Sequence, residues 1–109
     1  MKNFSDRYSL SLHQAVAERL RTEPAAVLRI ARDNLKRWLS SGAFDRAERS
    51  ALFEWQEILI EGRPETIISI ITADSDEGQR LRSSSPFAGV LSSRERDMSW
   101  SACAEIGLA

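Results

Sequence analysis

The sequence predicts an all-α protein, a compact bundle of five or six short helices. Apolar residues recur at three- and four-residue spacing along most of the chain, and helix-capping residues stand in the breaks between these stretches. The one strand-like run, TIISIIT at residues 66–72, has no obvious pairing partner, and a lone strand is not stable. With 109 residues, 42% hydrophobic and 28% charged, the chain is expected to form one domain over residues 9–100.

Residues 1–8 are expected to form a loose N-terminal arm ahead of this domain. Ser9 or Ser11 can then cap the first helix, because an apolar stripe follows at helical spacing. The stripe consists of Leu12, Val16 and Leu20. The first helix should therefore begin where the arm ends.

The second helix is expected to start at Pro24, whose missing N–H costs nothing in a first helical turn. It should be the longest element and run to about Leu39, with Gly42 ending it and Asp45 capping a third helix. Its inward positions are Val27, Leu28, Ala31, Leu35 and Trp38.

Residues 52–71 are the most apolar part of the chain, and the other helices are expected to pack on them. Gly62 suits a left-handed C-terminal cap of the third helix, and Pro64 suits the first turn of a fourth. Trp55 completes an apolar stripe here, as Trp38 does in the second helix. Both indole rings are therefore predicted to be largely buried.

A capping-box pattern, Asp74 with Glu77, predicts a short fifth helix that ends near Arg82. Gly78 lies inside this helix and should weaken it, since glycine has a low helix propensity. The fifth helix is therefore expected to be the least stable.

A second capping box, Ser92 with Glu95, predicts a last helix that ends near Trp100. Small residues dominate the segment that follows. Residues 101–109 are therefore expected to be a C-terminal tail.

The composition limits the classes of function. Residues 1–49 carry ten basic and six acidic side chains (+4), residues 50–79 carry one and seven (−6), and residues 80–109 carry four and three (+1). Contacts inside the fold or across a homodimer are expected to satisfy these charges before an anionic partner is needed. Cys103 is the only cysteine, which excludes an intrachain disulfide and a cysteine-based metal site and fits a cytoplasmic protein. No membrane segment, metal or cofactor is predicted.

Basic side chains form a stripe on the outer face of the second helix. The stripe consists of Arg29, Arg32, Lys36 and Arg37. Asp33 is placed to pair with Arg29 or Arg37. A solvated face is the favoured interpretation, and binding of a partner or of the phosphates of a nucleic acid is the alternative.

Residues 16–30, VAERLRTEPAAVLRI, have the outline of a helix-turn-helix DNA-binding motif. The turn of that motif usually requires glycine followed by a small apolar residue, whereas this chain has Arg21 and Thr22. Nucleic-acid binding is therefore an alternative and not the first interpretation.

Arg7 precedes His13, the only histidine, with five residues between them. This element resembles the Arg, spacer, His motif of the small helical ribonucleases called HEPN domains. The resemblance implies that His13 would act as acid or base while Arg7 steadies a phosphate. A packing or surface histidine explains the same residues and is favoured, the more so because Arg7 is expected to lie in the arm.

Residues 84–96, SSPFAGVLSSRER, are similar to a segment of a small group of bacterial all-helical proteins. Some members lie beside toxin and antitoxin genes or carry a helix-turn-helix domain. The resemblance extends over most of residues 9–96 and implies a non-enzymatic, antitoxin-type regulator. Candidate partner-binding residues in this segment are Pro86, Phe87, Val90 and Leu91. A loop that tucks its apolar side chains over the bundle explains them equally well.

The sequence therefore predicts a non-enzymatic interaction or regulatory protein that binds a partner protein, with DNA binding and ribonuclease activity as alternatives. Self-association is also predicted, through residues 67–71 and 87–91. A short chain buries a small fraction of its surface, and helices that are apolar on most sides need neighbours on most sides.

Overall fold

Residues 3–108, which are those that the computed structural model describes, form six α-helices and no strand. Side chains are described for residues 3–103. The helices are α1 (Phe4–Thr22), α2 (Pro24–Ser40), α3 (Arg46–Glu61), α4 (Pro64–Ile71), α5 (Asp76–Arg82) and α6 (Ser93–Leu108). The prediction of an all-α bundle of five or six helices is confirmed.

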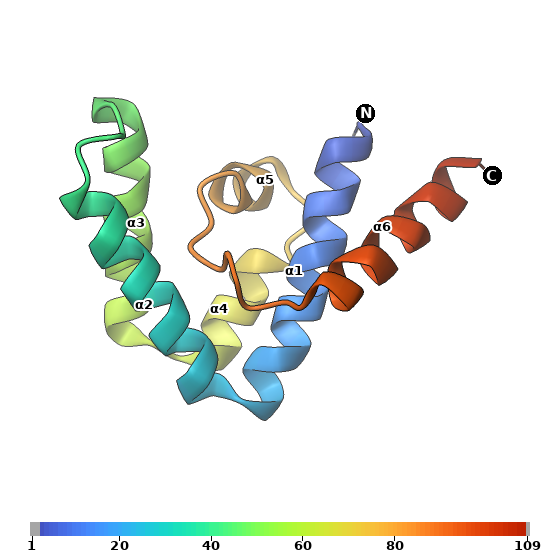
Figure 1. Ribbon diagram of the computed structural model, residues 1–109, viewed down its shortest axis with the longest axis horizontal. Coiled ribbons are helices and arrows are strands. Elements are labelled where there is room, and N and C mark those ends of the chain that lie inside the picture. Colours follow the sequence, from blue (N-terminus) through green and yellow to red (C-terminus); the bar gives the residue numbers. More distant parts are fainter. Residues whose placement is uncertain (1–2, 109) are drawn as a thin grey trace.

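Helix α1 is the element that most other helices contact. It packs against α2, α4, α5 and α6, most extensively against α6. Figure 1 shows α6 on one side of α1 and the α2–α3 pair on the other, with α4 and α5 between them. No helix in the described part of the chain is long and apolar enough to cross a membrane.

The prediction of a loose arm over residues 1–8 is wrong for the residues that the structure describes. Helix α1 begins at Phe4, capped by Asn3, whose side chain accepts a hydrogen bond of 2.9 Å from the backbone N–H of Asp6. The rings of Phe4 and Tyr8 pack against Trp100 of α6, at centroid distances of 4.6 and 5.3 Å. These contacts order the first turns, so α1 with 19 residues, and not α2 with 17, is the longest helix.

The last helix also extends further than predicted. Its capping box is confirmed, because Ser92 N–H donates to Glu95 Oε1 at 2.9 Å and Glu95 N–H donates to Ser92 Oγ at 3.1 Å. Helix α6 then continues past Trp100 to Leu108, so the tail expected at residues 101–109 is helical over all of it that the structure describes. Cys103, which lies in this extension, is buried.

Most of the caps that the sequence indicates are in place. Asp45 and Glu48 form a reciprocal capping box at the start of α3, and Gly62 ends that helix with φ at +62°. Helix α4 begins at Pro64 as predicted. For α5 the prediction was one residue off: the cap is Ser75, which accepts from the backbone N–H of Gly78, and not Asp74.

The core centres on Trp55, whose side chain is 0% exposed. Its indole N–H donates a 2.9 Å hydrogen bond to the backbone carbonyl of Leu81, and its ring meets Phe87 edge-on at 5.6 Å. The largest side chains buried with it include Leu20, Leu59, Ile67 and Ile71. The burial predicted for Trp55 is confirmed, whereas Trp38 is only partly buried, in the last turn of α2 beside Phe44 of the connection to α3.

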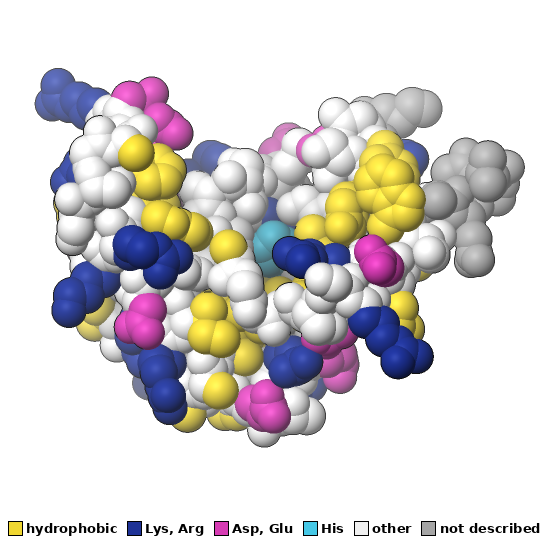
Figure 2. Space-filling view, in the orientation of Figure 1, with side chains coloured by type: hydrophobic (Ala, Val, Ile, Leu, Met, Phe, Trp, Pro, Cys, Tyr) yellow, Lys and Arg dark blue, Asp and Glu magenta, His cyan; other side chains and the backbone are white. Residues whose placement is uncertain are grey.

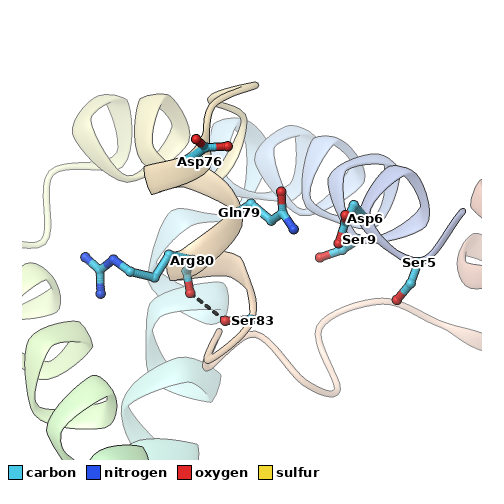
Figure 3. Close-up of a pocket in the computed structure, with 7 residues that line it drawn as sticks. All are labelled: Ser5, Asp6, Ser9, Asp76, Gln79, Arg80 and Ser83. Atoms are coloured by element: carbon cyan, nitrogen blue, oxygen red, sulfur yellow. Dashed lines mark hydrogen bonds between the residues drawn. The ribbon is translucent and has the colours of Figure 1, made fainter. Parts of the chain in front are cut away.

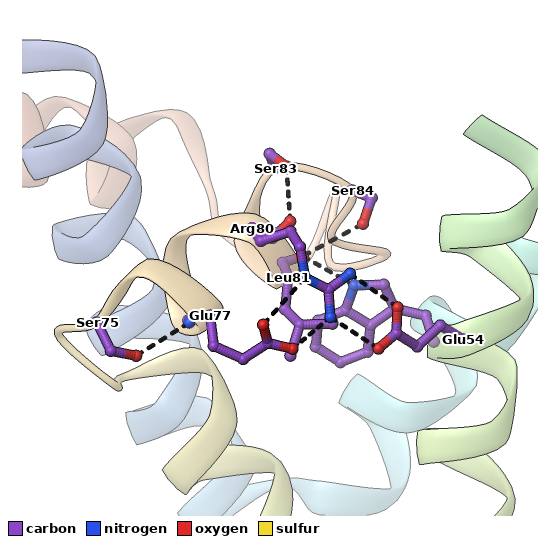
Figure 4. Close-up of polar contacts among 9 residues, drawn as sticks. Glu54, Ser75, Glu77, Arg80, Leu81, Ser83 and Ser84 are labelled. Carbon is purple, nitrogen blue, oxygen red and sulfur yellow. Dashed lines mark hydrogen bonds and ion pairs between the residues drawn. The ribbon is translucent and has the colours of Figure 1, made fainter. Parts of the chain in front are cut away.

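Two arginines join α5 to its neighbours. Figure 4 shows Arg80 between Glu54 of α3 and Glu77 of α5; it donates to both Glu54 oxygens, at 2.8 and 2.9 Å, and forms an ion pair with Glu77. Hydrogen bonding from this guanidinium lowers the pKa of the Glu54 carboxyl. The buried Arg82 donates to the backbone carbonyls of Ile71 and Ala73, at 3.3 and 2.7 Å, and so caps the C-terminal end of α4.

Gly78 is required by a close approach of the backbone and does not simply weaken α5. A Cβ atom at this position would lie 2.3 Å from the backbone carbonyl oxygen of Ala73 and 3.0 Å from its Cβ. The start of α5 could not then pack against the chain that leaves α4.

Gly78→Ala is therefore expected to lower the free energy of unfolding by about 2 kcal/mol, although alanine favours helix, because the backbone has to shift. Chemical denaturation followed by circular dichroism measures this. Gly42→Ala is the control, since Gly42 has φ at +57° but no atom within 4 Å of an added Cβ, so its cost is backbone strain alone. Wild-type stability of Gly78→Ala would contradict the close approach.

Candidate functional site

Helices α2 and α3 run side by side and exchange arginine contacts. Arg32 of α2 donates a 2.9 Å hydrogen bond to the carbonyl of Leu59, in the last turn of α3. Arg49 of α3 donates a 2.8 Å bond to the carbonyl of Leu39, in the last turn of α2. Carbonyls in a last turn lack partners within their own helix, so each arginine completes the end of the opposite helix.

A groove with a volume of about 620 Å³ lies between these two helices. Its lining residues are Arg32, Leu35, Lys36, Leu39, Ser40, Phe53, Gln56, Leu59 and Ile60. Phe53 is 46% exposed and Ile60 is 75% exposed, which is unusual for side chains of this size. The Arg49 guanidinium lies over the Phe53 ring, 5.7 Å from its centroid.

Two residues of the predicted basic stripe, Arg32 and Lys36, line one wall of this groove. Arg29, Arg32, Lys36 and Arg37 are all exposed, as the sequence predicts. Arg37 donates a 2.7 Å hydrogen bond to Asn34 Oδ1, so the pairing expected with Asp33 is replaced by a contact with a neutral amide. Arg32 and Arg49 likewise bind carbonyl oxygens, which do not neutralise their charge. The groove therefore combines an apolar floor with a positively charged wall.

The apolar residues predicted to bind a partner in the 84–96 segment are mostly part of the core. Pro86, Phe87 and Val90 are buried, and Leu91 is partly buried. The Asn34 side chain donates two hydrogen bonds of 2.8 Å, to the carbonyls of Pro86 and Ala88, and so fastens the segment to α2. The alternative interpretation, a loop tucked over the bundle, accounts for these residues.

Most of the surface predicted for self-association, at residues 67–71 and 87–91, is also covered within the chain, and self-association itself stays a prediction. Ile67 and Ile71 are fully buried, as is most of the apolar surface of the 87–91 segment. The chain covers these residues by itself, because α1 packs against α4 and α2 holds the loop. Among the side chains that the structure describes, the exposed large apolar ones are instead Phe53, Ile60, Met98 and Trp100.

His13 links helix α1 to the segment of residues 84–96, which lies far from it in the sequence. Its Nδ1 lies 2.7 Å from the carbonyl oxygen of Ser9 and its Nε2 lies 2.8 Å from Ser85 Oγ. A carbonyl can only accept, so Nδ1 carries the proton and Nε2 accepts from the Ser85 hydroxyl. Figure 2 shows the only histidine near the middle of one face, and only 7% of it is exposed. Burial, helped by the charge of Arg82, lowers its pKa to about 4.

These contacts bear on the alternative of ribonuclease activity. Arg7 lies in the same helix as His13, contrary to the prediction, because α1 begins at Phe4. Both ring nitrogens of His13 are used inside the fold, and its low pKa keeps the ring uncharged near neutral pH. The observed role of His13 is to tie α1 to the loop after α5.

The connection between α1 and α2 differs from the turn of a helix-turn-helix motif. Only Glu23 separates α1 from α2, and its backbone N–H donates to the carbonyl of Arg19 at 2.7 Å. The DNA-binding motif joins its helices by a turn of about three to four residues. This connection is too short to reproduce that turn.

A polar crevice of about 550 Å³ separates α1 from α5. Figure 3 shows Asp6 and Ser9 of α1 facing Gln79 of α5 across it, while the Arg80 side chain points away. Among the side chains that the structure describes, no group of three or more His, Cys, Asp or Glu residues could hold a metal ion. The crevice shows no constellation that favours a particular chemistry.

Sequence reasoning missed Phe53 and Ile60. They lie seven positions apart, with Arg49 one turn before Phe53, and so form a second stripe beside that of Leu52, Trp55 and Leu59. Two apolar stripes on one helix signal two packing surfaces, of which the core uses one. The seven-residue spacing of Phe53 and Ile60 could therefore have indicated the second surface from the sequence.

No protein-family model matches this sequence, and no curated protein or solved structure shows significant similarity to it. The similarity of residues 84–96 to helical regulators near toxin and antitoxin genes therefore stays a prediction.

Proposed function

We propose that this protein is a non-enzymatic interaction module that binds an acidic, amphipathic helix of a partner protein in the α2–α3 groove. The observation that carries the proposal is the exposure of Phe53 and Ile60 over a groove with a basic wall. Amphipathic helices bind such grooves with apolar residues at positions i, i+3, i+4 and i+7.

The groove defines the chemistry of the partner. Leucine-sized side chains would contact Leu35, Leu39, Phe53 and Ile60, all of which line it. Carboxylates on the flanks of the helix would approach Arg32 and Lys36. The Arg32 guanidinium is already fixed on the Leu59 carbonyl, so little side-chain entropy is lost when a carboxylate binds.

The apolar floor favours a protein partner over a nucleic acid. Phosphate contacts need cations and polar groups, and they gain nothing from Ile60, which is 75% exposed. The groove could also bind a second copy of this chain. The predicted homo-oligomer would then form through the groove and not through residues 67–71 and 87–91.

The test uses a designed helical peptide of about 15 residues, with leucine along one face and glutamate on its flanks. Fluorescence anisotropy measures its binding at moderate salt. The wild type is expected to bind with micromolar affinity, and Ile60→Glu is expected to weaken binding by at least about tenfold, because it places a charge on the apolar floor. Lys36→Glu should weaken binding as well, and more so at low salt.

Met98→Glu is the matched control, since Met98 is 65% exposed on α6 and lies outside the groove. It should leave peptide binding unchanged. Equal affinity for a peptide in which every glutamate is lysine would overturn the charge argument. Tight, salt-sensitive binding of duplex DNA would favour the regulator alternative instead. A dimer in sedimentation that Ile60→Glu dissociates would identify a second copy as the occupant.

A further inference from the structure

A further pocket, of about 460 Å³, lies at the end of the α2–α3 pair where residues 41–45 connect the two helices. One wall is apolar and aromatic and the other is formed by three consecutive serines. The lining residues are Trp38, Phe44, Ala47, Glu48, Ala51, Leu52, Ser83, Ser84 and Ser85. The rings of Trp38 and Phe44 are 6.2 Å apart and are both only partly buried. None of these residues lines the proposed helix-binding groove.

The hydroxyl hydrogens of the serine wall are already used. Ser83 Oγ donates to the carbonyl of Arg80 at 2.6 Å, and Ser84 Oγ donates to that of Leu81 at 3.4 Å. Ser85 Oγ donates to Nε2 of His13 at 2.8 Å, because that nitrogen carries no proton.

The backbone N–H groups of this wall are used as well. Those of residues 83–85 donate to the carbonyls of Gln79, Leu81 and Arg82, at 3.1 to 3.3 Å. A hydroxyl oxygen that has donated its hydrogen still has two lone pairs to offer, of which Ser85 already uses one, because its Oγ accepts from the backbone N–H of Phe87 at 3.3 Å. The serine wall can therefore accept hydrogen bonds from a ligand but has no hydrogen left to donate.

We propose that this pocket binds a primary ammonium group that carries an aromatic or alkyl body. The serine oxygens would accept the ammonium hydrogens, and the exposed carboxylate of Glu48 supplies the opposite charge. The Trp38 and Phe44 rings offer apolar contact to the body and π faces to the cation. A carboxylate ligand would meet lone pairs and a negative charge, so the pocket discriminates against acids.

The test is a ligand series on the wild-type protein, followed by two-dimensional ¹H–¹⁵N NMR. 2-Phenylethylammonium is expected to bind with a dissociation constant on the order of 1 mM and to shift the Trp38 indole N–H and the amides of residues 83–85. 3-Phenylpropionate, of similar size and opposite charge, should bind at least about tenfold more weakly. The N-trimethylated ammonium should also bind more weakly, because it has no N–H to donate.

Two variants locate the site. Ala51→Leu fills the pocket and is expected to abolish binding, and circular dichroism confirms that it folds. Ala25→Leu makes the same substitution at an exposed position of α2 outside the pocket and should bind like the wild type. Equal binding of the propionate, shifts confined to Phe53 and Ile60, or no shift at about 10 mM ammonium would each overturn the proposal. Because the two sites share no residue, this outcome is independent of helix binding in the groove.

Discussion

Trp55→Ala is expected to lower the free energy of unfolding by about 4 kcal/mol, the largest effect of any single substitution considered for this chain. The side chain is 0% exposed, so its removal leaves a cavity that the surrounding helices cannot fill. It also removes the edge-on contact with Phe87 and the hydrogen bond to the carbonyl of Leu81. Urea denaturation followed by circular dichroism measures the change.

Trp55→Phe separates these contributions. It keeps much of the apolar volume and loses the indole N–H, so it should cost less than half as much as the alanine variant. If Trp55→Ala lost no more stability than Trp100→Ala, whose ring is 51% exposed, the central position of Trp55 in the core would be contradicted.

Stability is expected to fall by about 3 kcal/mol between pH 7 and pH 4 through His13. Its folded-state pKa is about 4, below the ordinary value of 6.5, because burial disfavours the charged ring. Between those two values the unfolded chain binds a proton that the native protein does not bind. The contribution of the uncharged His13 ring to the free energy of unfolding is therefore fully present well above pH 6.5 and is lost as the pH falls toward 4.

Unfolding curves at closely spaced pH values measure this loss, and His13→Gln should flatten the profile between pH 4.5 and 6.5. Hydrogen bonds from Arg80 lower the pKa of Glu54 and Glu77. Those carboxylates contribute stability that is lost mainly as the pH falls below about 4.5, so the change between about pH 5 and 6.5 reports chiefly on His13. A wild-type profile that is flat between pH 5 and 7 would contradict the burial of an uncharged ring.

The elements that the sequence predicts well depend on local chemistry. Asp45 and Gly62 act within a single turn of chain, so their roles can be predicted without knowledge of the fold. Gly78 behaves differently, because its need for a missing Cβ comes from Ala73, in the chain that leaves α4. The length of α1 was underestimated for a similar reason: Phe4 is ordered by Trp100, almost a whole chain away.

The candidate site was predictable in its charges and not in its apolar part. A basic stripe on a helix stays exposed wherever the other helices lie, so Arg32 and Lys36 were identified from spacing alone. Phe87 and Phe53 are indistinguishable by hydrophobicity, yet one is 5% exposed and the other 46%. Which apolar face is covered depends on the packing of α1 and α2 against distant segments, and no local pattern records that.

The packing of α1 against later helices has a consequence for synthesis of the chain. Helices α4, α5 and α6, which pack against α1, all leave the ribosome after α1. The ion pair between Arg19 of α1 and Glu95, at 2.7 Å, can form only when residue 95 has emerged. Helices α2 and α3 are adjacent in sequence and can pair early, each arginine binding the end of its neighbour. Until α6 emerges, the face of α1 that α6 covers has no partner in the chain, and we expect this stage of synthesis to expose apolar surface of the kind that chaperones bind.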